Sequence, residues 1–368
     1  MSEDAEVIKS PHAMKSSAST YAAREAYHAG SWYAADAGTL QAQLEGWLAE
    51  ARSAPVTGVT VDAPDDAGND DDRSSLNCNG SAPSEQVVLV NTRVKALIAP
   101  HAGYAYSGPT AAYAYRFVSA EAYDQVWVLG PSHHVYLQNC AVSGASALRT
   151  PLGDLPVDVA VTQRLTQQHP ELFRWMSQGM DEHEHSIEMH LPYVAHAFRG
   201  HLQRVRVVPV MVGALSAAME ERVGRALAEY VQQPRTLFVV SSDFCHWGQR
   251  FGYTRGGDDV EGRERQRHGT PLHEYIQQLD MKGMRAIESG VPEAYRQYQQ
   301  ATGNTICGRH PIAVLLHALA TAAAAASDPC TIRFVRYAQS SRCEDVRDSS
   351  VSYAAAVVYP PDAPASRI

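Results

Sequence analysis

The segment Lys95-Ala-Leu-Ile-Ala-Pro-His101-Ala-Gly-Tyr-Ala-Tyr106-Ser-Gly108 contains a short apolar run that ends abruptly in proline, histidine and glycine. Such a run predicts a buried strand, and Pro100 and Gly103 end it. In an open α/β sheet, ligands bind just beyond the carboxyl ends of the strands. His101 is therefore a candidate site residue, although a single histidine in a turn can equally be structural.

The same arrangement occurs twice more in the chain. Gln125-Val-Trp-Val-Leu-Gly-Pro-Ser-His133-His134 breaks at Gly-Pro and delivers two histidines. Thr236-Leu-Phe-Val-Val-Ser-Ser-Asp243-Phe-Cys245-His246 delivers an aspartate, a cysteine and a histidine. The strand candidate at 204–213, by contrast, ends without such groups. Three strands that place metal-binding and acid/base residues at one edge predict a functional site there.

A fourth segment adds a cysteine. In Asn304-Thr-Ile-Cys307-Gly-Arg309-His310-Pro311, the proline suits the first turn of a helix expected over 312–325. Cys307 then lies just outside a helix N-terminus, where partial positive charge favours the thiolate, the form that binds metal and reacts. The alternative is a buried, inert cysteine.

A dense charged cluster runs from Asp181 to Tyr193, with the sequence Asp-Glu-His183-Glu-His185-Ser-Ile-Glu-Met-His190-Leu-Pro-Tyr. The simplest interpretation is a solvated charged loop that leads into a helix. As a group near an edge already rich in histidine, the cluster can instead support metal ligands or contact a substrate. His28, in His28-Ala-Gly-Ser-Trp-Tyr33, is interpreted as a capping group rather than a site residue.

Two imidazoles with a thiolate or a carboxylate resemble the open triads that hold iron, copper or zinc. His246 and Asp243 can serve as an acid/base group and the residue that orients it. Spacing alone does not separate metal ligands from residues that support them.

Composition excludes several classes of protein. The chain of 368 residues has a net charge of −9, and its acidic residues concentrate between 53 and 90. No basic stripe of the kind that binds nucleic acid is present. The sequence contains no apolar run of about 18 residues and no secretory signal. This predicts a protein that does not insert into membranes and that lies in the cytoplasm or also in the nucleus. The six cysteines are scattered without a Cys-x-x-Cys pair, so neither a disulfide framework nor a zinc finger is expected.

One domain is expected. Residues 1–22 are expected to form a disordered tail, residues 23–360 an α/β domain interrupted by an acidic insertion at 53–90 that is expected to be disordered, and residues 361–368 a C-terminal tail. Residues 252–268 are polar and are expected to be irregular. The remaining helices and strands are expected over these ranges: helices at 38–51, 109–120, 157–168, 216–232, 271–288 and 291–301, and strands at 331–338 and 351–359.

The motifs quoted above that contain histidine, aspartate or cysteine closely resemble those of the Memo family (mediator of receptor-tyrosine-kinase-driven cell motility). The resemblance runs from about Arg24 to Tyr359 and excludes the acidic insertion. Tyr337-Ala-Gln-Ser-Ser belongs to the same set of motifs. The resemblance implies a single α/β domain with a central mixed β-sheet flanked by helices, like the class III extradiol, non-haem-iron dioxygenases (LigB-like).

The resemblance also implies that His101, His133 and Cys307 fill the metal-binding positions, with His246 as the acid/base residue and Asp243 beside it. In the dioxygenases the third ligand is a carboxylate. A thiolate is softer and oxidisable, which puts ring cleavage in doubt and shifts the preference toward copper or zinc. The further residues expected to support or line the pocket are His134, His183, His185, His190, Tyr104, Arg309 and Cys245.

Members of the Memo family are described as binding copper or iron, promoting redox chemistry, and acting as signalling effectors in cell motility that bind phosphotyrosine peptides. Three functions follow as hypotheses. The first is a copper- or iron-binding redox protein, with zinc as another candidate metal. The second is an active dioxygenase of a small aromatic substrate. The third is a phosphotyrosine-peptide adaptor without catalysis.

Overall fold

A mixed β-sheet forms the centre of the computed structural model, which describes residues 21–54, 60–61, 93–326, 328–361 and 363. Within these residues, neighbouring strands follow the order β2 (Thr60–Val61), β12 (Thr331–Gln339), β13 (Ser350–Tyr359), β3 (Ala96–Ala99), β10 (Thr236–Ser241), β4 (Gln125–Pro131), β9 (Arg206–Val212), β5 (Cys140–Val142) and β8 (Phe173–Trp175). The short strand β11 (His246–Trp247) pairs with β13. A smaller sheet contains β1 (Tyr21–Arg24), β6 (Ala145–Leu148) and β7 (Leu155–Pro156).

The middle of the large sheet is parallel. Strand β10 pairs in parallel with β3 on one side and with β4 on the other, and β4 pairs in parallel with β9. Strand β13 then pairs antiparallel with β3, which makes the sheet mixed. The carboxyl ends of β3, β10 and β4 therefore lie at one edge, as their apolar, histidine-ended sequences predict.

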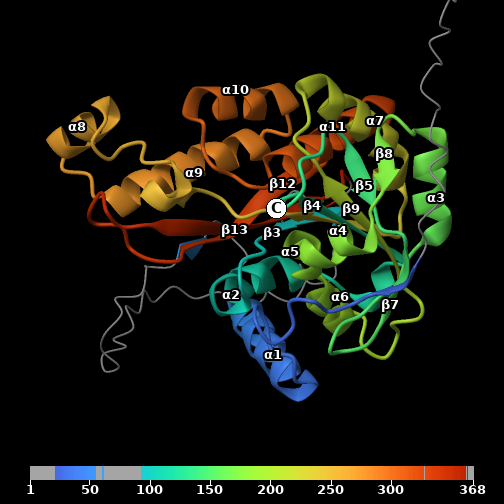
Figure 1. Ribbon diagram of the computed structural model, residues 1–368. Helices are drawn as coiled ribbons and strands as arrows, with labels where there is room; N and C mark the ends of the chain where they lie inside the picture. Colours follow the sequence, from blue (N-terminus) through green and yellow to red (C-terminus); the bar gives the residue numbers. More distant parts are fainter. Residues whose placement is uncertain (1–20, 55–59, 62–92, 327, 362, 364–368) are drawn as a thin grey trace, which may run out of the picture.

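Helices cover both faces of this sheet, because its central strands are apolar on both sides. In β3, Leu97 and Ala99 pack in one core cluster and Ala96 and Ile98 in the other. The first cluster includes residues of α1 (Ala37–Ser53), α2 (Tyr104–Tyr115) and α6 (Leu191–Ala197). The second includes residues of α3 (Val159–Gln168), α7 (Ala217–Gln232), α9 (Leu272–Glu288), α10 (Pro292–Thr302) and α11 (Arg309–Ala326). Figure 1 shows these layers, with α1, α2 and α6 below the sheet and α7, α10 and α11 above it. The prediction of a single α/β domain with a central mixed sheet is confirmed.

Two element predictions were wrong. Helix α2 begins at Tyr104 rather than at Pro109, because the carbonyl of Gly103 accepts hydrogen bonds from the N–H groups of Tyr106 and Ser107 and starts the helix earlier. The segment predicted to be irregular contains α8 (Val260–Arg267). This helix is polar, so it lacks apolar periodicity, and it is held at its start by Asp259, whose carboxylate accepts from the N–H of Gly262.

The predicted tails and insertion fall largely outside the described residues. Within them, Tyr21 and Ala22 already belong to β1, and Thr60–Val61 forms β2, which pairs with β12. Ser53, the first residue of the predicted insertion, is the last residue of α1.

Among the described residues, the helices are too short or too polar for any of them to cross a membrane.

Candidate metal centre

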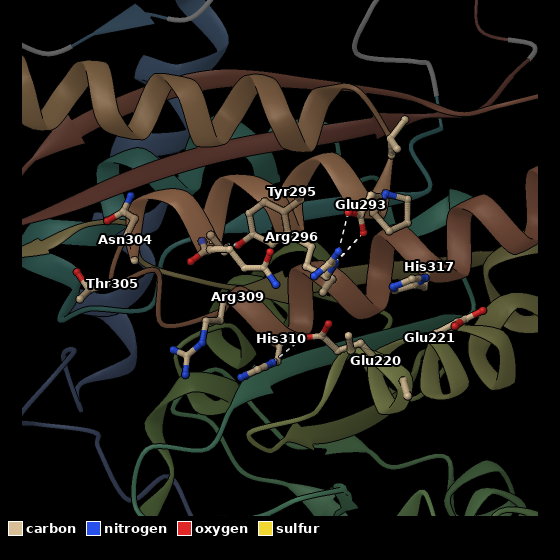
Figure 2. Close-up of a pocket in the computed structure, with 18 residues that line it drawn as sticks. Glu220, Glu221, Glu293, Tyr295, Arg296, Asn304, Thr305, Arg309, His310 and His317 are labelled. Atoms are coloured by element: carbon tan, nitrogen blue, oxygen red, sulfur yellow. Dashed lines mark hydrogen bonds and ion pairs between the residues drawn. The ribbon is translucent and has the colours of Figure 1, made fainter.

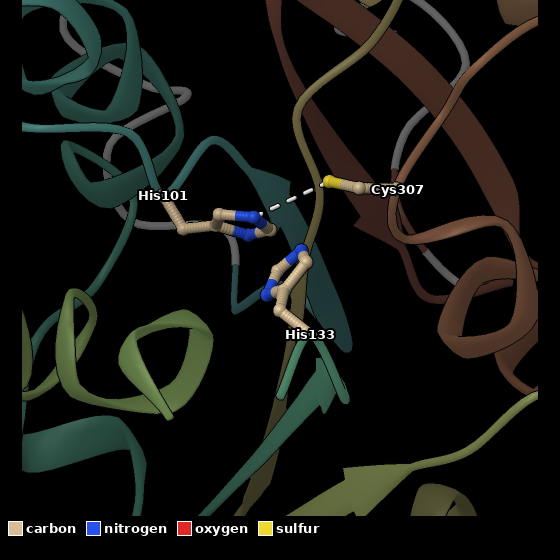
Figure 3. Close-up of side chains that lie close together, drawn as sticks. All are labelled: His101, His133 and Cys307. Carbon is tan, nitrogen blue, oxygen red and sulfur yellow. Dashed lines mark hydrogen bonds between the residues drawn. The ribbon is translucent and has the colours of Figure 1, made fainter. Parts of the chain in front are cut away.

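Three predicted ligands meet at the carboxyl edge of the parallel strands. His101 follows β3 and His133 follows β4. Cys307 lies on the loop that precedes α11, and this loop passes the same edge of the sheet (Figure 3). One potential ligand atom from each of the three side chains lies within 4.8 Å of the other two. The Cys307 Sγ is 3.2 Å from Nε2 of His101. The side chains are close enough for one metal ion to bind all three.

The tautomer of His101 is set by a serine. Ser241, the last residue of β10, donates its hydroxyl proton to the carbonyl of Ser186 at 2.7 Å. Its Oγ, 2.6 Å from Nδ1 of His101, therefore accepts the Nδ1–H and leaves Nε2 as a lone pair that faces Cys307. Burial, together with the neighbouring histidines, lowers the pKa of His101 well below its ordinary value. His101 is thus a neutral imidazole, the form that binds metal.

The orientation of His133 is set by a carboxylate. Nδ1 of His133 lies 2.8 Å from Oε1 of Glu184, and the backbone N–H of His133 donates to Oε2 at 2.6 Å. Burial alone would raise the pKa of Glu184, but its hydrogen bonds with His133 lower it to about 2. The ionised carboxylate accepts Nδ1–H and leaves Nε2 free. A carboxylate behind a histidine is the common support of a metal ligand.

The surroundings of Cys307 favour its protonated thiol in the metal-free protein. Burial, reinforced by the nearby charge of Asp243, raises the pKa of its thiol well above the ordinary value. The backbone N–H groups of Asp243 and Gly308 favour the thiolate, as the position before α11 predicts, and the first of them donates to Sγ at 3.2 Å. The loss of solvation outweighs both hydrogen bonds, which agrees with the alternative of a buried cysteine. A bound metal ion would displace this proton.

Asp243 and His246 lie beside the centre, but no hydrogen bond joins their two side chains among the described residues. The carboxylate of Asp243 accepts the backbone N–H of His101 at 2.8 Å. Burial raises the pKa of Asp243 above the ordinary value, while the charge of His246 acts to lower it. Nδ1 of His246 lies 2.9 Å from the carbonyl of Phe244 and 3.1 Å from that of Thr305. These carbonyls, rather than Asp243, orient His246 and leave its Nε2 available for proton transfer.

The acidic cluster at 181–193 is not a solvated loop. It forms α4 (Gln178–His183), α5 (His185–Glu188) and the start of α6, and its residues Asp181 and Glu188 are buried. Both carboxylates pair with the buried Arg24, whose Nε is 3.1 Å from Asp181 and whose Nη1 is 2.7 Å from Glu188. The guanidinium also donates to the carbonyl of Glu184 at 3.0 Å. Arg24 thus anchors the segment that supports His133.

Comparison with known proteins agrees with this geometry. Residues 74–357 match the family model described as Memo-like protein. The chain belongs to the Memo-like family. Protein MEMO1 of Danio rerio is 43% identical over 332 residues, which cover 90% of this chain and 96% of the relative. Protein MEMO1 of Homo sapiens is 42% identical with the same coverage, and the memo-1 homolog of Caenorhabditis elegans is 39% identical over 338 residues, covering 91% of this chain and 82% of the relative.

The solved structure of an uncharacterised Escherichia coli K12 protein covers 71% of the Memo-like chain and 99% of its own, with 15% identity and a TM-score of 0.42. A likeness this weak adds nothing to the assignment, which rests on the family match and the relatives. The predicted membership of the Memo family is confirmed.

Two of the predicted pocket residues of this Memo-like chain lie at the centre or its rim. The ring of His185 stacks on that of His133 with centroids 4.5 Å apart, and it lies 5.4 Å from the ring of His101. His134 is exposed and meets His185 edge-on at 6.0 Å. Trp32 also packs on His185, at 4.3 Å. His185 therefore packs against both candidate histidine ligands, and His134 and Trp32 pack against His185.

Three other predicted residues point elsewhere. His183 is exposed, and its Nδ1 lies 2.6 Å from the carbonyl of Gly179. His190 is buried beside Tyr115, whose hydroxyl is 3.0 Å from Nδ1. Tyr104 is buried and donates to the carbonyl of Met189 at 2.7 Å. These side chains stabilise the surrounding helices.

Cys245 also faces away from the ligands. It is buried in a separate cluster with Trp247, while His246, between them, is directed to the other side. Alternate residues of an extended segment point to opposite faces, so a side chain next to His246 cannot share its direction.

Arg309 lines a cavity that is separate from the metal centre. A cavity of about 910 Å³ lies between α7, α10 and α11, and Arg309 and Thr305 are on its wall (Figure 2). Inside it, His310 is 2.6 Å from Glu220, and Arg296 pairs with Glu293 at 2.6 Å. His101, His133 and Cys307 do not line this cavity.

The sequence interpretation missed two supporting residues, Glu184 and Ser241. Glu184 stands inside the charged cluster, but nothing in its spacing distinguishes it from the neighbouring carboxylates. Ser241 ends β10 two residues before Asp243, and a hydroxyl at the end of a strand that leads to a site was the available signal.

Proposed function

We propose that this Memo-like protein binds a redox-active transition metal, copper or iron, through His101, His133 and Cys307. The observation that carries the proposal is the convergence of two imidazoles and one thiol within 4.8 Å, with the other nitrogen of each imidazole held by a protein group. Two nitrogens with a soft thiolate suit Cu(I) and zinc, and imidazole also binds iron. The donor set therefore fits the metals that the family resemblance implies.

A bound copper or iron ion would supply one-electron redox chemistry. The protein's own groups prepare the site for it. Ser241 and Glu184 hold the two imidazoles in the tautomers that present Nε2, and Cys307 releases its proton when a metal binds. Nε2 of His246 is available to accept or donate a proton next to the centre.

Metal content provides the direct test. The full chain is purified anaerobically under reducing conditions, and iron, copper and zinc are measured by mass spectrometry in wild type, Cys307→Ala, His133→Ala and the control Cys330→Ala. We expect near-stoichiometric copper or iron in wild type and control, the loss of copper from Cys307→Ala, and the loss of all metal from His133→Ala. An absence of metal from the wild type, even after reconstitution with Cu(I) and with Fe(II), contradicts the proposal.

The orientation of His246 favours oxygenation of a small aromatic substrate as a second function. Its Nδ1–H is directed to two carbonyls, so a neutral His246 can act as a base through Nε2. Oxygen consumption is measured with a panel of catechols and anaerobically supplied Fe(II), for wild type and His246→Gln. No consumption across the panel rejects this function. If metal is absent as well, the remaining hypothesis is phosphotyrosine-peptide binding that survives His133→Ala.

A further inference from the structure

We propose that the same pocket contains a second, alternative cation site, formed by His133, Glu184 and His185 and selective for Fe(II) or Zn(II) over Cu(I). It shares His133 with the first site and replaces the His101 nitrogen and the Cys307 sulfur by a carboxylate oxygen and another imidazole nitrogen. The inference rests on the proposed function only in naming the first site.

The positions of the three side chains support the binding of one cation by all of them. One potential ligand atom from each lies within 4.8 Å of the other two. The rings of His133 and His185 are stacked, with an interplanar angle of 16°. Nδ1 of His185 is 3.6 Å from Oε1 of Glu184, too far for a good hydrogen bond. One nitrogen of each ring and the carboxylate are thus neighbours. Because an imidazole lone pair lies in the plane of its ring, one of the two stacked rings has to rotate for both nitrogens to bind the same cation.

His185 has one of several buried side-chain atoms among the described residues that no hydrogen-bond partner reaches. This atom is Nδ1. Buried polar side-chain atoms are nearly always paired, and leaving one unpaired costs about 1–3 kcal/mol. By contrast, Nδ1 of His101 and Nδ1 of His133 both have protein partners. A cation between His185 and Glu184 would supply the partner that the protein does not.

The donor set determines which cation fits. Two histidines and one carboxylate are the ligands of non-haem Fe(II) oxygenases and of zinc hydrolases. The first set contains a thiolate, which favours the softer Cu(I). In the second arrangement the Nδ1 proton of His133 moves to Nε2, and Glu184 exchanges its hydrogen bond with the His133 side chain for a bond to the cation. Glu184 keeps the backbone N–H groups of His133 and Ser186 as donors. The carboxylate therefore remains supported.

The two imidazole side chains are partly exposed, although Nδ1 of His185 is itself buried. The side chain of His133 is 28% exposed and that of His185 12%, whereas Glu184 is 1% exposed behind them. A cation can reach the two imidazoles from the open side while the carboxylate holds it from within. Because His133 belongs to both sets, a hard cation and a soft cation compete for the pocket.

Co(II) and Zn(II) titrations of the reduced full-length protein test the second site. Cys307→Ala removes the first site. In this background we expect one equivalent of Co(II) or Zn(II) to bind, and the Co(II) spectrum to lack thiolate-to-metal charge-transfer absorption. Adding His185→Phe keeps a stacked ring but removes both nitrogens, and it should weaken binding by more than about 100-fold, since even the loss of a supporting residue costs 10–100-fold. His183→Phe, on the exposed neighbour, is the matched control and should change nothing.

Two results would overturn the second site: no Zn(II) or Co(II) binding by Cys307→Ala while circular dichroism shows it folded, or equal binding with and without His185→Phe. Failure of the first site has a different signature. It is the absence of Cu(I) binding and of thiolate charge-transfer absorption in wild type, and it leaves the titrations of Cys307→Ala unaffected.

Discussion

Replacing Ser241 by alanine tests whether the protein presets the tautomer of His101. In the wild type the Ser241 hydroxyl accepts Nδ1–H of His101 and donates to the carbonyl of Ser186, and all three groups are buried. The alanine keeps the strand and the packing but leaves the imidazole without the group that selects its tautomer. The proton of His101 can then move to Nε2. This nitrogen needs a free lone pair to bind the metal, so the tautomer that is protonated there cannot act as a ligand.

The expected magnitude follows from the contacts that are lost. Removing a group that supports a metal-binding histidine typically weakens metal binding 10- to 100-fold, which is about 1.4–2.8 kcal/mol of binding free energy. The free energy of unfolding should fall as well, by about 1–3 kcal/mol for each buried polar group left without a partner. The Cu(I) affinity and the unfolding free energy therefore both decrease.

Cu(I) affinity is measured by competition with a chromophoric chelator under anaerobic conditions, and stability by urea unfolding. Ser350→Ala is the control. Ser350 is also a buried serine on a strand, but its hydroxyl donates to the carbonyl of Ser341 and does not hold a candidate metal ligand. It should lose stability without losing Cu(I) affinity. The reasoning is refuted if Ser241→Ala binds Cu(I) as tightly as the wild type.

Three further predictions concern stability. Arg24→Met leaves two buried carboxylates without their cationic partner and should lower the free energy of unfolding, measured with urea, by about 3–5 kcal/mol. Burial raises the pKa of Asp280 to about 6, against an ordinary 3.8, so the folded state holds this proton more tightly than the unfolded state. Stability should thus fall by about 3 kcal/mol between about pH 4 and pH 6 through this group, and Asp280→Asn should remove that part of the pH dependence. Gly130→Ala should cost about 1–3 kcal/mol, because a Cβ there would lie 2.5 Å from Oγ of Ser186 and 2.9 Å from Cγ1 of Ile187.

Each of these has a decisive comparison. Arg24→Met with a loss under about 1 kcal/mol would show that the buried pairs are replaceable. Parallel pH profiles of wild type and Asp280→Asn would contradict the raised pKa. For the glycine, Gly46→Ala is the control, since a Cβ there meets nothing within 4 Å in α1 and should be neutral or stabilising.

The outline of the site could be predicted because it depends on local pattern. Apolar runs that stop at Pro100 or at Gly130-Pro131 predict strands, and parallel strands bring their carboxyl ends to one edge. His101 and His133 were located by that rule, and Cys307 by Pro311, which was expected in the first turn of the next helix and lies in the first turn of α11. The predicted orientation failed for Cys245, although strand alternation beside His246 contained the needed signal.

The sequence by itself determined the α/β class, the strands that end at the site, and the types of side chain delivered there, since these follow from hydrophobic periodicity and from residue chemistry. The tertiary structure decided which partners those side chains have. Glu184 reaches His133 from 51 residues away in the chain, and Ser241 reaches His101 from 140 residues away. The protonation of Cys307 depends on burial by the whole fold. Tautomer, charge and exposure arise from contacts between distant segments, and no local pattern encodes them.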